Sequence, residues 1–123
     1  MNSIILFFDG EVRSIEDLFI AIGGQKQGGR RIMLEKSNSW LSIDKLSKPF
    51  CDYDELERET ILSLIDNPTA LLIEWRNDEI LQDIFEKLSL DNNIVVDNDH
   101  GLICTLLDLK GLHISEWIRE KTQ

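Results

Sequence analysis

A run of five consecutive apolar residues near the start of the chain constrains the fold more than any other feature. Residues 4–8 are β-branched, aliphatic and aromatic without polar alternation, which predicts a strand covered on both faces. Residues 70–73 form a second, shorter apolar run of the same kind. We therefore expect these two strands to lie side by side in the middle of one sheet.

Three further segments repeat apolar residues at helical spacing, and each follows residues that can cap a helix. These segments are residues 15–22, 56–65 and 80–88. The expected caps are, in the same order, Ser14, Asp52 or Asp54, and Asn77. The buried stripe of the second helix is expected to consist of Leu56, Thr60, Ile61, Leu64 and Ile65.

Two pairs of extended segments flank turn-forming residues and predict hairpins. Residues 31–35 and 40–43 enclose a short polar turn. Residues 94–96 and 102–107 enclose residues 97–101, whose Asp, Asn and Gly suit a tight connection. Both hairpins would add antiparallel strands to the sheet.

The order of these elements predicts the fold class. Strands, helices and hairpins mix along the chain, and residues 115–118 form either a short last helix or an irregular tail. A chain of 123 residues is long enough for one connected core and too short for two ordinary domains. We expect one α/β (α+β) domain over residues 1–123, with three or four helices packed on a mixed sheet of about six strands.

The charge of the chain limits its partners. With 23 acidic and 13 basic residues the formal net charge is −10, which repels phosphate backbones and anionic membrane surfaces. Direct binding to nucleic acid or to a membrane is therefore not expected. The charge has two interpretations that composition leaves open: it favours encounter with a basic protein, or it serves solubility alone.

The cysteines and the apolar runs indicate the compartment. Cys51 and Cys104 lie far apart without CxxC spacing, so we expect two free thiols, with Cys104 in a core strand. The apolar run at residues 4–8 is too short to span a bilayer, and no basic residue precedes it as in a secretory signal. These features predict a protein of the reducing cytoplasm.

Two loops resemble ligand sites only superficially. Residues 23–31 hold four glycines and three cations, but they lead from a helix into a strand, the reverse of a phosphate-binding loop. We expect a helix end and a mobile connection there, with a contact loop in a complex as the alternative. Residues 97–101 space two aspartates as in a calcium loop, yet the glycine and the closing glutamate do not fit. No metal or other cofactor is expected.

Catalytic residues are not evident in the sequence. His100 lies in an expected turn, His113 lies near the end of the chain, and no nucleophile or metal-binding motif accompanies either of them. We therefore predict no enzymatic activity and no catalytic residues. A small enzyme whose active-site residues lack a motif remains an alternative.

The densest acidic segment surrounds the expected start of the second helix. Its carboxylates are Asp52, Asp54, Glu55, Glu57 and Glu59. Acids in a first helical turn gain from the helix dipole, but this benefit fades further along, and Glu55 with Glu59 forms a repulsive i,i+4 pair. The crowding has two interpretations, an ordinary solvated face or a partner-binding surface.

Aromatic residues supply the other candidate contacts. Trp75 and Trp117 are expected to pack in or near the core. Trp40 alternates with polar residues on its strand, so it is the candidate for an exposed anchor. We place Trp40 and Tyr53 with the five acidic residues in one predicted partner-binding surface.

A small acidic α/β domain with free cysteines, no catalytic set and a carboxylate-rich helix start resembles the immunity proteins of bacterial toxin–immunity systems, including contact-dependent growth inhibition. The resemblance is to the class, and it rests on residues 52–59 and on the charge of the whole chain. It implies a cytoplasmic protein that binds one cognate toxin, commonly a nuclease, and covers its active site or its route to substrate. Carboxylates suit that task because a nuclease presents Lys and Arg to phosphates.

Other classes stay open beside this resemblance. The chain can be a structural or regulatory subunit of a larger assembly, and its oligomeric state has no signature in the sequence. Its basic residues, notably Lys26, Arg30 and Arg31, also leave room for an acidic toxin or one that is not a nuclease. A neighbouring gene for a large secreted protein with a toxin-like C-terminal region would favour immunity, and an operon of metabolic genes would favour the alternatives.

Overall fold

The computed structural model describes residues 2–9, 13–29, 31–36, 38–48, 53–87 and 94–118. The strands are β1 Asn2–Asp9, β2 Gln25–Gln27, β3 Arg31–Lys36, β4 Ser39–Lys45, β5 Pro68–Trp75, β6 Ile94–Asp97 and β7 Ile103–Thr105. The α-helices are α1 Arg13–Ala21, α2 Glu55–Leu64 and α3 Asp78–Lys87. Two 3-10 turns follow, η1 Leu106–Leu109 and η2 Ile114–Glu116.

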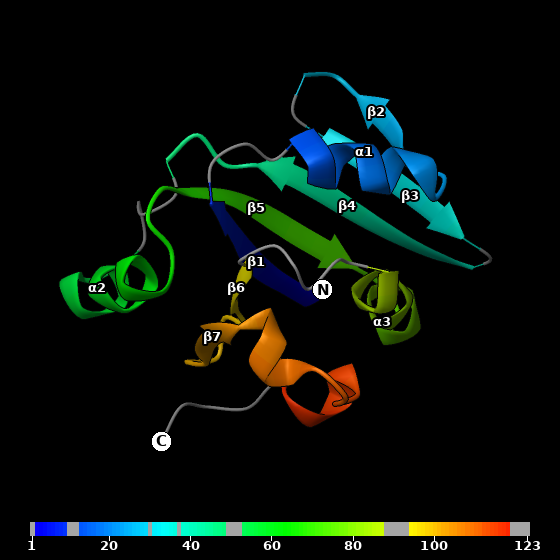
Figure 1. The fold of residues 1–123 in the computed structure, drawn as a ribbon. Coiled ribbons are helices and arrows are strands. Elements are labelled where there is room, and N and C mark those ends of the chain that lie inside the picture. The colour runs from blue at the N-terminus through cyan, green and yellow to red at the C-terminus, as the bar shows by residue number, and fades with distance from the viewer. Residues whose placement is uncertain are drawn as a thin grey trace.

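The strands form one sheet of seven, in the order β2-β3-β4-β5-β1-β6-β7 (Figure 1). As expected, β1 and β5 lie side by side in its middle, with Leu6 opposite Leu71 and Ile4 opposite Ile73. All four of these side chains are almost fully buried. The apolar runs are continuous because both faces of these central strands are covered.

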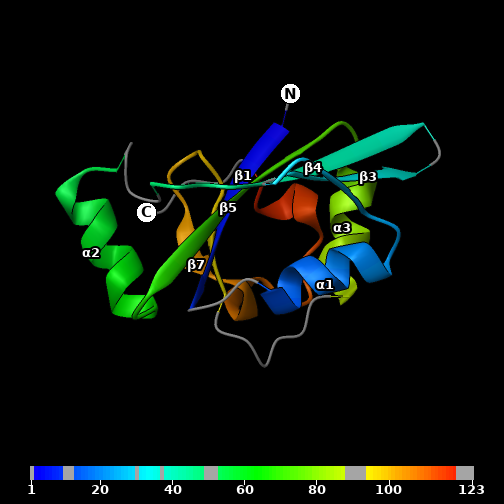
Figure 2. The same ribbon diagram turned by 90° about the horizontal axis from the view of Figure 1, so that it is seen from above.

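The two faces of the sheet carry separate hydrophobic clusters. On the first face, α1, α3 and the C-terminal turns pack against alternate strand residues such as Leu41, Ile73 and Trp75. On the second face, α2 packs through Ile61 and Ile65 against a smaller cluster that includes Phe7 of β1. Figures 1 and 2 show α2 beside the start of β5, apart from α1 and α3.

The α+β class is confirmed, and two details of the sheet differ from the prediction. Every pairing between the described strands is antiparallel, where we expected a mixed sheet. The seventh strand is β2, which lies in the glycine-rich segment expected to be a mobile connection and pairs with β3. Its three side chains are all exposed, so backbone pairing rather than burial holds it.

The end of α1 fits the prediction that glycines stop this helix. Gly23 has φ of 111°, and its N–H donates to the carbonyl of Ile20 over 3.1 Å. The N–H of Gly24 donates to the carbonyl of Phe19 over 2.8 Å, which completes a Schellman-type C-cap. A Cβ on Gly24 would lie 2.7 Å from the Phe19 carbonyl oxygen, so the chain passes too close here for any side chain.

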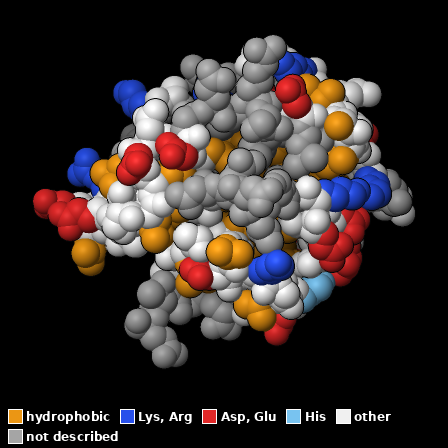
Figure 3. All heavy atoms as spheres, in the orientation of Figure 1, with side chains coloured by type: hydrophobic (Ala, Val, Ile, Leu, Met, Phe, Trp, Pro, Cys, Tyr) orange, Lys and Arg blue, Asp and Glu red, His pale blue; other side chains and the backbone are white. Residues whose placement is uncertain are grey.

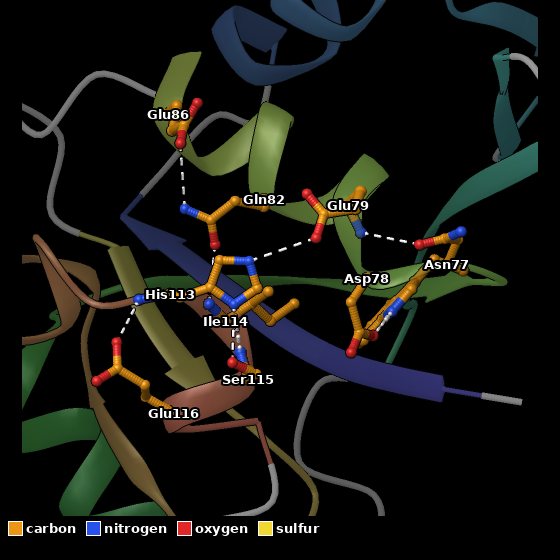
Figure 4. A network of polar contacts seen from close by, with 10 residues as sticks. Asn77, Asp78, Glu79, Gln82, Glu86, His113, Ile114, Ser115 and Glu116 are labelled. Atoms are coloured by element: carbon orange, nitrogen blue, oxygen red, sulfur yellow. Dashed lines mark hydrogen bonds and ion pairs between the residues drawn. The ribbon is translucent and has the colours of Figure 1, made fainter.

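The C-terminal segment forms a 3-10 turn that is fastened to the rest of the domain. Asn98, fully buried in the turn after β6, donates from Nδ2 to the carbonyl of Trp117 over 2.8 Å. The backbone N–H of Ile114 donates to Gln82 Oε1 of α3 over 2.8 Å (Figure 4). The ring of Trp117 stacks on Phe85 with centroids 5.5 Å apart, and Trp75 and Trp117 are buried as expected.

Among the other predictions for the described residues, the α3 cap and the second hairpin are confirmed, and the length of one strand is wrong. Asn77 caps α3 as expected, and the buried stripe of this helix includes Ile80, Leu81 and Ile84. The second hairpin is present, but the strand after its turn ends at Thr105, where the run predicted as strand becomes η1. No helix among the described residues is both long and apolar enough to cross a membrane.

Candidate functional site

The acidic segment begins α2 through a capping box. Asp54 is the N-cap, and its Oδ1 accepts a hydrogen bond from the N–H of Glu57 over 2.8 Å. Glu57 Oε1 in return accepts from the N–H of Asp54 over 3.1 Å. These two carboxylates therefore satisfy free N–H groups at the helix start, which gives them a structural role. Asp52 lies outside the described residues.

The outer face of α2 combines acidic and apolar side chains. Glu55, Leu56, Glu59 and Leu62 are all exposed, and we call these four residues the α2 ridge. Leu56 is 72% exposed and Leu62 is 45% exposed. Figure 3 shows red acidic and orange hydrophobic side chains together at the left edge of the molecule, over α2.

The exposure of Leu56 corrects the prediction that it belongs to the buried stripe. The buried stripe of α2 centres on Ile61, which is fully buried. Leu56 precedes Ile61 by five positions, which places it about 140° around the helix axis, on the solvent side. Thr60 and Leu64 are half-buried at the edges of the stripe.

The carboxylates of the α2 ridge lie near one cation, the exposed Arg58, which follows Glu55 by three positions on the same helix. Among the residues that the structure describes, neither Glu55 nor Glu59 makes an ion pair. They lie four residues apart on the same helix face, where like charges repel by a few tenths of a kcal/mol, roughly 0.2–0.5. The ridge is thus a negative surface with two apolar side chains in it.

Tyr53 attaches the start of α2 to the sheet. Its hydroxyl donates to Asp97 Oδ2 of β6, and its half-buried ring meets the Phe7 ring edge-on at 5.8 Å and 62°. Burial, followed by the hydrogen bond to Asp97, raises the pKa of Tyr53. The sequence predicted Tyr53 as an aromatic anchor for a partner, and the structure shows that its ring and hydroxyl already serve contacts within the chain.

Asp97 is the most buried carboxylate among the described residues, at 7% exposure. Burial raises its pKa, and hydrogen bonds from the Tyr53 hydroxyl and the N–H of Asp99 oppose that rise by favouring the ionised form. Protonation of Asp97 therefore weakens the hydrogen bond from Tyr53 that attaches the start of α2, so this attachment contributes to the pH dependence of stability.

Tyr53→Phe is expected to lower the free energy of unfolding by about 1–3 kcal/mol at neutral pH, because ionised Asp97 loses a donor. The pKa of Asp97 in the folded variant should rise further above its unfolded value. The difference in unfolding free energy between the two proteins should therefore be largest above the Asp97 pKa of the folded variant. It should become smaller as the pH falls through that pKa and Asp97 is protonated. Urea denaturation of both proteins at about pH 7 and about pH 4 checks this expectation. An equal loss at both pH values would contradict the assigned role of the hydrogen bond.

A second candidate surface lies on the sheet, around Trp40. A hollow of about 610 Å³ is lined there by Arg31, Met33, Glu35, Asn38, Ser39, Trp40, Ser42, Glu74 and Arg76, and we call it the Trp40 hollow. Register pairs Glu35 with Trp40 across β3 and β4. Trp40 is half-buried, and Ser42, expected on the polar face of the strand, is 3% exposed.

The structure does not bring Trp40 next to the acidic start of α2. Trp40 lies near the start of β4, whereas Leu46, just past the other end of β4, packs in the same cluster as Tyr53. At about 3.3 Å per residue, the strand from Trp40 to Lys45 is roughly 17 Å long. The predicted single surface therefore divides into the α2 ridge and the Trp40 hollow.

One ion pair joins Arg31 of the Trp40 hollow to Asp44, which lies outside the lining. Arg31 holds both oxygens of Asp44, with Nε 2.9 Å from Oδ1 and Nη2 3.2 Å from Oδ2. This hydrogen bonding and the charge of Asp44 raise the pKa of Arg31. Glu35 and Glu74 line the hollow without a described ion pair, and Arg76 is the other cation of the lining.

A third polar group, around His113, has the composition of a hydrolase triad but not its geometry (Figure 4). His113 Nδ1 lies 2.8 Å from Ser115 Oγ, and Nε2 lies 3.5 Å from Glu79 Oε1. However, Nδ1 also accepts from the backbone N–H of Ser115 over 3.1 Å, so its lone pair caps η2. Sequence reasoning missed this group because its carboxylate comes from α3, far away in the chain.

Cys104, His100 and Cys51 are the remaining residues that the sequence analysis considered as reactive groups. Cys104 lies half-buried on the edge strand β7 with a free thiol, rather than deep in a core strand. Burial, with a smaller effect from Asp108, raises the pKa of this thiol to about 11, so it stays protonated at neutral pH. His100 is exposed in the predicted turn, and Cys51 lies outside the described residues.

The α2 ridge and the Trp40 hollow are thus the candidate binding surfaces among the residues that the structure describes. In the described ranges, no cluster of three or more His, Cys, Asp or Glu side chains is arranged to hold a metal ion. Neither a protein-family model nor a curated protein nor a solved structure matches this chain.

Proposed function

We propose that this protein is an immunity-type inhibitor that binds a cognate bacterial toxin with a basic surface, most simply a nuclease, through the α2 ridge. It neutralises the toxin by covering the basic active site or substrate-binding surface. The observation that carries the proposal is the exposure of Leu56 and Leu62 beside unpaired Glu55 and Glu59 on one helix face.

The composition of the α2 ridge suits a protein interface. Single exposed leucines are common on protein surfaces, so neither Leu56 nor Leu62 is informative alone. An exposed helix face can enter a groove on a partner. At about 100° per residue, Glu55 and Glu59 lie between Leu56 and Leu62 around the helix, so the ridge fits a groove with Lys or Arg at its centre and apolar residues on both sides.

The attachment of α2 supports its use as a rigid recognition element. The capping box at Asp54 and Glu57 fixes the start of the helix, and Ile61 and Ile65 bury its inner face. The hydrogen bond to Asp97 ties Tyr53, the residue before the N-cap, to β6. A preorganised helix loses little conformational freedom on binding, so more of the contact energy appears as affinity.

The charge of the chain adds a long-range contribution. A formal net charge of −10 attracts a basic toxin and speeds the encounter between the two proteins. We place this encounter in the cytoplasm, where an unpaired thiol such as that of Cys104 is stable and where an intracellular toxin would act.

Co-expression with the product of the gene directly upstream tests the proposal. If that product carries a toxic C-terminal region, we expect this chain to restore growth of cells that express the region and to co-purify with it. The charge-reversed variant Glu55→Lys/Glu59→Lys should fail to protect. Asp17→Lys/Glu86→Lys, with the same change of net charge on α1 and α3, should still protect. Loss of protection in both variants, or in neither, would contradict a role for the α2 ridge.

A further inference from the structure

The geometry points to a second recognition site in the Trp40 hollow, which we propose receives an arginine or lysine side chain of a partner protein. The cationic group lies over the indole ring of Trp40, between Glu35 and Glu74. The inference relies on the proposed function only for the identity of that partner.

The strand register places the relevant side chains on one face of the sheet, where they line the hollow. Glu35 is directly opposite Trp40, Met33 is opposite Ser42, and Ser42 is in turn opposite Glu74. Directly opposed residues of paired strands point to the same face. This is the second face of the sheet, on which α2 covers the Phe7 region. Met33 and Trp40 thus supply apolar surface, with carboxylates on both sides.

The balance of charges in the hollow favours a cationic guest. Arg31 is compensated by its two hydrogen bonds to Asp44, at 2.9 and 3.2 Å. Glu35 and Glu74 then remain against Arg76, so the lining residues, which are neutral by themselves, carry one net negative charge together with Asp44. Arg76 lies next to Trp40, with its backbone N–H donating to the Trp40 carbonyl over 3.1 Å, and its side chain adds a donor that suits a main-chain carbonyl or an acidic neighbour of the inserted side chain.

The chemistry of the lining matches a guanidinium or ammonium group. Tryptophan is the best aromatic partner for a cation placed over its ring, and a carboxylate at the same site forms a charge-assisted hydrogen bond. A volume of about 610 Å³ accommodates a long side chain together with parts of its neighbours. Tryptophan, arginine and methionine are also enriched at the centres of protein interfaces.

The indole N–H resonances of the free protein provide the test. Trp75 is fully buried and Trp117 is 3% exposed, so their signals are internal controls for the half-buried Trp40. The probe is the blocked tripeptide acetyl-Gly-Arg-Gly-amide, and its matched control carries citrulline, a neutral isostere, in place of arginine. We expect the arginine peptide to shift the Trp40 signal saturably and the citrulline peptide to bind at least about tenfold more weakly.

Two variants make the outcome specific. Glu35→Gln keeps the shape of the side chain and removes its charge, so it should weaken binding of the arginine peptide about fivefold to tenfold. Asp17→Asn removes one charge on α1, far from the hollow, and should leave binding unchanged. Equal binding of both peptides, a shift that does not saturate, or an unaffected Trp40 signal would overturn the proposal. No toxin takes part, so this result stands apart from the test of the α2 ridge.

Discussion

Replacement of Glu55 and Glu59 by lysine is expected to remove most of the affinity for the cognate toxin while leaving the fold intact. Central interface contacts typically contribute about 2 kcal/mol or more each, which corresponds to a change of roughly thirtyfold in the dissociation constant. The same changes should shift the free energy of unfolding by no more than about 1 kcal/mol, because both side chains are exposed and unpaired and only Glu55, in the first turn, interacts with the helix dipole.

Titration of the wild type and of this variant against the toxin, at low and at high salt, checks the expectation. Exposed charges are screened beyond about 8 Å at physiological ionic strength, so wild-type binding should slow and weaken as salt rises. The reversed variant should bind weakly at both salt concentrations, and Asp17→Lys/Glu86→Lys should retain most of the affinity. If the wild type and the reversed variant bind equally at both, the α2 ridge is an ordinary solvated face.

Leu6→Ala is expected to lower the free energy of unfolding by about 2–5 kcal/mol, through lost burial and the cavity that remains. Leu6 is fully buried at the centre of the sheet, opposite Leu71 of β5. Ile73→Ala, on the neighbouring strand, should have an effect of similar size. Such losses are large against a total stability of about 5–15 kcal/mol for a typical domain.

The exposed leucine of α2 provides a matched control for this measurement. Leu56→Ala removes the same atoms from a side chain that is 72% exposed, so stability should change by no more than about 0.5 kcal/mol. Urea denaturation of the three variants gives the comparison. A loss below about 1 kcal/mol in both Leu6→Ala and Ile73→Ala would show that the centre of the core lies elsewhere.

The central part of the fold could be predicted because burial leaves a clear pattern there. The uninterrupted apolar runs at residues 4–8 and 70–73 identified the two central strands, and the helical spacing of Ile80, Leu81 and Ile84 identified α3. Each of these segments buries most of its apolar side chains in the core. Where burial decides the structure, the hydrophobic pattern of the sequence is a sufficient guide.

The errors occur where backbone hydrogen bonds or local geometry decide instead. The segment Gln25–Gln27 has no apolar residue, so nothing in its pattern indicates that its backbone pairs with β3. The run after Cys104 is apolar enough for a strand, but Thr105 Oγ1 accepts from the N–H of Asp108 over 3.3 Å and starts η1. Such capping bonds give only a weak signal in a single sequence.

The candidate site was only partly predictable because tertiary contacts decide which side of α2 is exposed. The acidic segment is visible in the sequence, but the orientation of α2 is not, because Leu56 and Ile61 are equally apolar. Tertiary contacts of Ile61 and Ile65 on the sheet decide which side of the helix is exposed. The division between the α2 ridge and the Trp40 hollow likewise depends on the path of β4, which no local pattern reveals.

The two surfaces lie on the same side of the sheet, opposite α1 and α3. From Trp40 to Lys45, β4 extends roughly 17 Å toward the region that α2 covers. If one toxin contacts the α2 ridge and also places a basic side chain in the Trp40 hollow, its interface must span more than this length of strand.

The leucine methyl resonances of the protein, recorded with and without the toxin region of the upstream gene product, show whether the toxin binds at the α2 ridge. Leu56 and Leu62 on α2 and Leu107 and Leu112 near the C-terminal turns are all exposed, so one spectrum holds both probes and controls. We expect the signals of Leu56 and Leu62 to change on binding and those of Leu107 and Leu112 to stay unchanged. Changes confined to Leu107 and Leu112 would place the interface on the opposite side and contradict this expectation.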